Sequence, residues 1–132
     1  MHEAERALFH PMLVHFPIAF YFLEFFLLGL WKFKKEEHFL RFSFLAFRLA
    51  YVTMIIAMIA GYRDSGGITP HVSKHFYSAL SVFAVNTVRG AFWFRMNKKQ
   101  AFCPWTLLIG SFICIILVSI TGDLGGDLVY KP

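Results

Sequence analysis

The chain has 132 residues and a net charge of +5, and 58% of its residues are hydrophobic, 19% aromatic and only 16% charged. This length accommodates one domain, and a mean hydropathy of 0.57 is too high for an ordinary soluble domain. The composition therefore predicts an integral membrane protein whose direct partner is the lipid bilayer. Its positive charge follows from membrane topology, and no nucleic-acid partner is expected.

Four apolar runs, at residues 11–31, 42–61, 71–95 and 103–121, are each about long enough to cross a hydrocarbon layer of ~30 Å as a helix. We therefore expect one all-α domain over residues 1–132, a bundle of four transmembrane helices with up-down topology, similar to cytochrome b. Pro11 suits the first helical turn, with His10 as the N-cap. The glycines of "TGDLGGD" (residues 121–127) are expected to follow the end of the last helix.

Basic residues gather in the segments that join the first helix to the second and the third to the fourth. These residues are Lys32, Lys34, Lys35, Arg41, Arg95, Lys98 and Lys99. The positive-inside rule places this side in the cytoplasm. Both termini are then outward, facing the periplasm if the membrane is the inner membrane of a Gram-negative bacterium.

Most histidines fall on the outward side of this topology, and only His38 falls on the cytoplasmic side. His15 and His75 both lie ~6 Å below the outward rim, on helices that stand diagonally across an up-down bundle. Two imidazoles facing each other at one level are what a b-type haem requires. The leading prediction is a haem b protein that takes part in electron transfer, with His15 and His75 as the iron ligands.

Further residues can complete such a site. Glycines leave space for a flat ring, aromatic side chains line its faces, a rim cation meets its propionates, and a carboxylate orients a ligand imidazole. Gly61, Gly110 and Gly122 are the candidates to leave space for the ring, and Phe16 and Phe76 are the candidates to line its faces. Arg63 is the candidate to meet the propionates, and Asp64 or Asp123 is the candidate to orient the imidazole. One haem near one face cannot carry electrons across the bilayer, so a quinone, a periplasmic redox protein or another membrane subunit is expected as a partner.

Two other interpretations remain open. His71 and His75, four residues apart, form an outward copper or zinc site if His10 or His15 and Asp64 or Asp123 join them. Alternatively, the histidines are structural, and the chain is an assembly subunit of a larger membrane complex. An oligomer is compatible with each interpretation. No nucleophile with an adjacent base is apparent, so a hydrolytic site is not expected.

Three charged residues fall deep within the apolar runs, away from their ends, where charge is costly and needs a partner. Glu24, Arg48 and Arg89 lie on three different helices, each about 9 to 11 Å from the cytoplasmic rim. A common depth predicts a buried network in which one carboxylate lies between two guanidinium groups. Its role is either a polar clamp between helices or a proton path or ligand site.

Several stretches resemble a family of small bacterial membrane proteins, the domain of unknown function 2231. They are "HPMLVHFPIA" at residues 10–19, "GYRD" at residues 61–64, His75, Arg89, and "GGDLVY" at residues 125–130. The resemblance covers nearly the whole chain and implies a four-span bundle similar to small cytochrome b-like membrane proteins. It also implies that His10, His15 and His75 are motif positions, and it assigns no activity.

Overall fold

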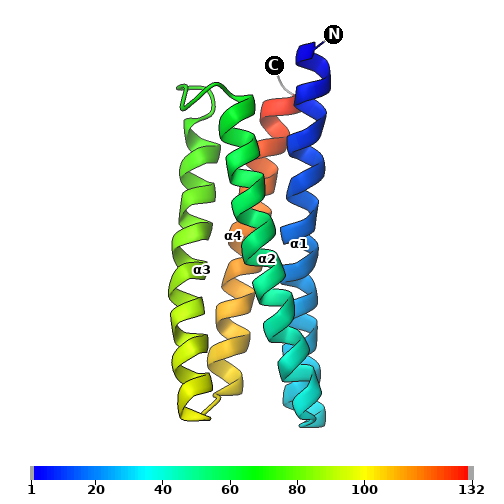
Figure 1. Cartoon of the computed structure of the whole chain (residues 1–132), viewed down its shortest axis with the longest axis vertical. Coiled ribbons are helices and arrows are strands. Elements are labelled where there is room, and N and C mark those ends of the chain that lie inside the picture. Colours follow the sequence, from blue (N-terminus) through cyan, green and yellow to red (C-terminus); the bar gives the residue numbers. More distant parts are fainter. Residues whose placement is uncertain (1, 131–132) are drawn as a thin grey trace.

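The computed structural model describes the backbone of residues 2–130 and the side chains of residues 12–128. It contains four helices: α1 (His2–Lys34), α2 (Glu37–Asp64), α3 (Ser73–Lys99) and α4 (Pro104–Tyr130). The helices run alternately up and down as one bundle, with both termini at the same end (Figure 1). The expected all-α fold is confirmed.

The helices extend beyond most of the expected ends. Helix α1 begins at His2, so His10 is not an N-cap, and Pro11 and Pro17 lie inside the helix. Helix α4 continues through "TGDLGGD" to Tyr130, so the prediction that these glycines follow the helix was wrong. A glycine costs only about 1 kcal/mol in a helix interior, and packing against neighbouring helices offsets that cost.

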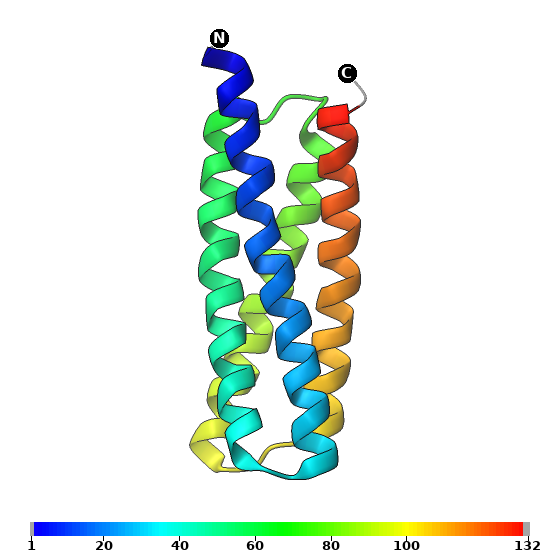
Figure 2. The same cartoon turned by 90° about the vertical axis from the view of Figure 1, so that its right-hand side faces the viewer.

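Short connections determine the order of the helices. Lys35, with a φ of 57°, ends α1, and Gln100, with a φ of 51°, ends α3 in the left-handed conformation. The longer connection between α2 and α3 uses Gly66 and Gly67 at positive φ. Such connections make sequential helices antiparallel neighbours, as Figure 2 shows from the side.

Helix α1 packs most extensively against α2, and α4 packs against both α1 and α3, while α2 and α3 pack less closely. The backbones of α1 and α3 do not come into contact within residues 2–130, so these two helices form one diagonal of the bundle. Small side chains on α2 (Ala46, Ala50 and Ala57) are buried, and they allow the close approach of helices that membrane bundles use.

The outer surface of the bundle is apolar. Three helical stretches are long and apolar enough to cross a membrane: Met12–Lys34, Glu37–Asp64 and Pro104–Leu128. Helix α3 is not among them, because polar residues within the helix, including Asn86 and Arg89, lower its mean hydropathy. The structure thus supports a helical membrane protein with at least three apolar helices in its described part.

Candidate functional site

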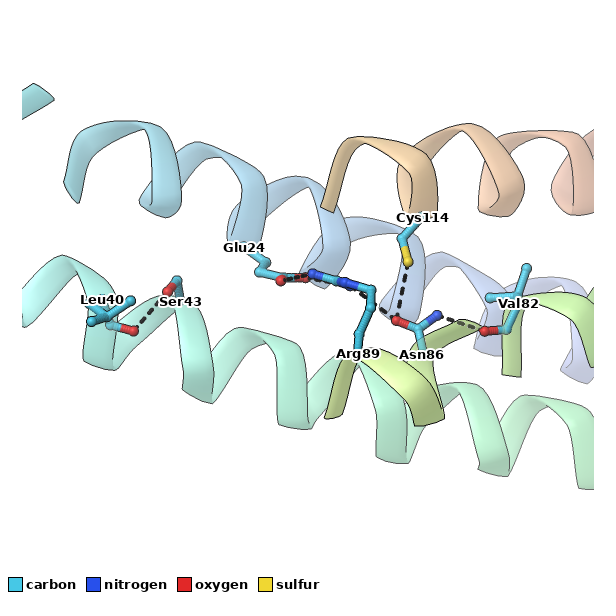
Figure 3. Close-up of polar contacts among 7 residues, drawn as sticks. All are labelled: Glu24, Leu40, Ser43, Val82, Asn86, Arg89 and Cys114. Carbon is cyan, nitrogen blue, oxygen red and sulfur yellow. Dashed lines mark hydrogen bonds and ion pairs between the residues drawn. The ribbon is translucent and has the colours of Figure 1, made fainter. Parts of the chain in front are cut away.

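The centre of the bundle holds an ion pair between α1 and α3, across the diagonal. Glu24 is completely buried and Arg89 is 9% exposed. The Arg89 guanidinium donates through Nη2 to Oε1 of Glu24, and through Nη1 to Oε2 at 3.4 Å (Figure 3). Two charges paired in this way tie together two helices whose backbones do not touch.

Asn86 and Cys114 extend the ion pair into a four-residue network, which we call the central network: Glu24, Asn86, Arg89 and Cys114. The Asn86 side-chain oxygen accepts from Nη1 of Arg89 at 3.1 Å and from the Cys114 thiol at 3.4 Å. Its amide nitrogen donates to the Val82 carbonyl at 2.8 Å. Buried polar groups of this kind are tolerated because each has a partner.

Arg48, which the sequence placed in this network, lies elsewhere. It is exposed on α2, and its guanidinium carbon lies 4.3 Å from the centre of the Phe44 ring. The sequence placed Arg48 at the same depth in the membrane as Glu24 and Arg89, but depth does not determine the direction in which a side chain points. Asn86, three residues before Arg89, shares a helix face with it, and that spacing is the signal that could have identified the missing member.

Gly110 was expected to make room for a haem, but the space beside it belongs to the central network. A Cβ built on Gly110 would lie 3.3 Å from Nε of Arg89. Gly122 instead packs on α1, where a Cβ would lie 3.7 Å from Ile18, and Gly61 is half-buried in α2. The spaces beside Gly110 and Gly122 are therefore occupied by side chains of neighbouring helices, Arg89 and Ile18.

His75 turns toward α4. Its ring Nδ1–H donates to the Thr121 carbonyl at 3.0 Å, and a Cβ on Gly125 would lie only 2.9 Å from its Cε1. Beside it, the Ser78 hydroxyl lies 2.6 Å from the Thr121 hydroxyl. The carbonyl of Thr121 therefore orients this imidazole, in place of the expected Asp64 or Asp123.

His15 does not meet His75. Contacts of Gly122 with Ile18 and of Gly125 with His75 put the two histidines within about one helical turn of the same level. However, His15 is exposed on α1, whereas His75 is half-buried against α4. As placed, the two rings do not form the axial pair that a b-type haem needs. The side chain of His10 lies outside the described residues.

The residues expected around the haem are also dispersed. Phe16 is exposed and lines a shallow apolar depression of about 250 Å³ with Leu13, Thr53 and Ile56, smaller than the ~300–1,000 Å³ of typical cofactor sites. The Phe76 ring packs edge-on against Tyr77, and Arg63 is exposed at the end of α2. The residues described therefore do not fit a haem in this arrangement.

The copper or zinc alternative finds no cluster either. His71, Asp64 and Asp123 are all exposed. Among the residues that the structure describes, no three His, Cys, Asp or Glu side chains are close enough to share a metal ion.

Cations and indole rings gather at the opposite end from the termini. The Lys32 ammonium lies 3.0 Å from the centre of the Trp105 ring, and His38 lies 3.3 Å from the carboxylate of Glu36.

Cys103 precedes α4 and is exposed. Hydrogen bonds from the side chain and the backbone N–H of Thr106 lower the pKa of the Cys103 thiol, as is usual for a cysteine at a helix N-terminus.

A family model described as a predicted membrane protein, domain of unknown function 2231, matches residues 7–132. No curated protein matches the chain, and no solved structure does.

Proposed function

Because the chain belongs to the domain of unknown function 2231 family of predicted membrane proteins, we propose that it is a structural subunit of a bacterial inner-membrane complex. In this proposal the bundle spans the membrane four times, and the central network locks α1 to α3. One observation carries the structural role: Glu24 and Arg89 neutralise each other across the bundle diagonal, and both are buried.

The surface of α3 supports the fourth span. Its most polar mid-helix residues, Asn86 and Arg89, point inward and are buried. Many of its outward positions are large and apolar, as contact with lipid requires, and the exposed hydroxyls of Ser81 and Thr87 donate to carbonyls of the same helix. The large apolar positions include Tyr77, Leu80, Val88, Phe92 and Phe94. A helix whose most polar side chains are buried and bonded inside the bundle, as Asn86 and Arg89 are, crosses a membrane at a lower cost than its average composition indicates.

The charge distribution supports the orientation. The end of the bundle away from the termini holds seven basic residues, Lys32, Lys34, Lys35, Arg41, Arg95, Lys98 and Lys99, against two acidic ones, Glu36 and Glu37. We call it the basic end, and the positive-inside rule makes it cytoplasmic. Both termini then face the periplasm.

The position of the central network favours a clamp over a proton path. A proton path would need a continuous series of neighbouring polar groups from one side of the membrane to the other. Between the central network and the pair formed by Ser78 and Thr121 lie buried apolar side chains, Val82, Ile115 and Val118. About two helical turns separate Cys114 from Thr121 on α4, so the two polar groups are not continuous.

Variants of the ion pair test the clamp. Glu24→Ala leaves the buried Arg89 without its counter-charge, which costs about 3–5 kcal/mol in a protein interior. Glu24→Gln keeps the shape and one acceptor and is expected to cost less. Replacing both residues with leucine and methionine is expected to restore most of the stability, since an apolar pair of similar volume removes both buried charges.

The measurement is thermal unfolding of the purified protein in mild detergent, together with its mass on a native gel of solubilised membranes. Equal melting temperatures for wild type, Glu24→Ala and Glu24→Gln would contradict the clamp. Migration of the wild-type chain only as a free 15.3 kDa protein would contradict the subunit role.

One observation favours a second candidate, electron transfer with haem b. His75 donates Nδ1–H to a carbonyl, as most metal-ligating histidines do. His15 would have to turn from the outer face of α1 into the core. An absorption spectrum decides: a Soret band that disappears in His75→Ala supports the haem protein and its expected quinone or redox partner, while a colourless preparation supports the structural subunit.

A further inference from the structure

Arg48 is a cation on the outer face of α2, and no side chain described between residues 12 and 128 neutralises its charge. It is exposed, and among the described side chains no carboxylate pairs with it, since the ion pairs there are His38 with Glu36 and Arg89 with Glu24. Its guanidinium carbon lies over the Phe44 ring at 4.3 Å. A charge on the lipid-facing side of a membrane helix needs a partner from outside the chain.

The depth of Arg48 is set by the aromatic residues around it. Phe44 and Phe47 pack on Trp93 of α3, with ring centres 4.9 and 6.4 Å apart. Trp93 lies near the end of α3 that carries Lys98 and Lys99, the basic end. Arg48 therefore lies about one turn inside an aromatic layer of the kind found at headgroup level.

The direction of the side chain follows from the direction of the helix. Helical side chains lean toward the N-terminus of their helix, and α2 begins at the basic end. Stacking on Phe44, four residues earlier, is the observed result of that lean. The guanidinium thus points from the apolar layer toward the headgroups, as a long cationic side chain does when it snorkels.

Arg41 completes a pair. It lies seven residues before Arg48, about 10 Å along the axis and within ~20° around it, and it is exposed too. Leu45 and Val52 lie on the same face and are 51% and 53% exposed. Together the four residues form a stripe in which Arg41, Leu45, Arg48 and Val52 follow one another from the basic end toward the membrane centre.

We propose that this stripe is a binding site for an anionic phospholipid. Arg41 and Arg48 hold the phosphate, for which guanidinium groups are suited because they donate paired hydrogen bonds. The acyl chain lies along Leu45 and Val52. A lipid is favoured over a protein carboxylate because the guanidinium leans toward the headgroup layer, where phosphates are abundant, and because basic clusters next to membrane helices attract anionic lipids.

The test measures the lipid that the purified protein retains. Detergent-solubilised wild-type protein is incubated with equal amounts of dioleoylphosphatidylglycerol and dioleoylphosphatidylcholine, repurified, and its bound lipid is quantified by mass spectrometry. We expect enrichment of the anionic lipid, with about a fivefold weaker preference after Arg48→Gln or Arg41→Gln. Arg63→Gln, at the other end of the same helix, is the matched control and keeps the preference.

Arg48→Lys separates charge from packing. It retains the cation but not the paired hydrogen bonds, so it should keep more of the preference than Arg48→Gln does, even if Arg48→Gln melts at a lower temperature. Addition of free inorganic phosphate should not displace the lipid, because phosphate alone lacks the acyl contacts. Equal retention of both lipids by wild type, an equal loss of preference in Arg63→Gln, or displacement by inorganic phosphate would overturn the proposal. So would a crosslinked dimer that disappears in Arg48→Gln, since Arg48 would then bind a second copy of the chain.

Discussion

The contact between Gly125 and His75 gives a sharp prediction about α4. A Cβ at position 125 would lie 2.9 Å from Cε1 and 3.2 Å from Nδ1 of His75, whereas ordinary contacts begin at 3.4 Å. The ring would have to move by about 0.5 Å, and it is held by its hydrogen bond to Thr121. Gly125→Ala is therefore expected to push His75 away from that carbonyl.

The expected magnitude combines three effects. Overpacking costs about 1–3 kcal/mol, and loss of the His75 hydrogen bond costs about 0.5–1.5 kcal/mol. Replacing glycine with alanine stabilises the helix by up to ~1 kcal/mol, which offsets part of these costs. The net result is a destabilisation of about 0.5–3.5 kcal/mol for Gly125→Ala.

Gly126 supplies the matched control, since a Cβ there meets nothing within 4 Å. Gly126→Ala should therefore be neutral or stabilising by up to ~1 kcal/mol. The assay is thermal unfolding in detergent, followed by the intrinsic fluorescence of the tryptophans.

A double variant isolates the contact itself. In a His75→Ala background the clash is absent, so adding Gly125→Ala should cost less than it does in the wild-type background. Two results would refute the reasoning: equal effects of Gly125→Ala and Gly126→Ala, or strict additivity of Gly125→Ala with His75→Ala.

Other predictions concern the cysteines and the central network. Because its pKa is lowered by Thr106, the Cys103 thiol should be alkylated at a lower pH than an ordinary thiol, with the rate rising as pH increases through that lowered pKa. The buried Cys114 should stay unlabelled until the protein unfolds. A membrane-impermeant thiol reagent should label Cys103 in inverted vesicles and not in intact spheroplasts, and the reverse pattern would contradict the orientation. Gly110→Ala would place a Cβ 3.3 Å from Nε of Arg89, close to the 3.4 Å at which ordinary contacts begin. Because that contact is less tight than the 2.9 Å contact at Gly125, the melting temperature of Gly110→Ala should fall less than that of Gly125→Ala.

The sequence was sufficient for some parts of the site and not for others. Glu24 and Arg89 were identified because charges within apolar runs are rare and costly, and the structure places them in contact. Arg48 met the same depth criterion but points outward over Phe44. Asn86 and Cys114 carry no charge, so the depth argument overlooked them, although Asn86 and Arg89 share a helix face.

For the histidines, too, the sequence predicted position along the helix but not the direction of the side chain. The common level of His15 and His75 was predicted to within about a turn, because the rise per residue is nearly constant. The direction of each ring was not determined by depth: His15 is exposed, and His75 is bonded to the Thr121 carbonyl.

By itself, the amino-acid order determined the number of helices, their apolar character and the concentration of cations at one end, because these depend on local composition and on the repeat of a helix. Only the tertiary structure decided where the helices end, which glycine receives a side chain from a neighbour, and which charge faces the core. Those outcomes depend on the rotation of each helix about its own axis. That rotation is set by packing against other helices, and a run of apolar residues on nearly every face leaves it unspecified.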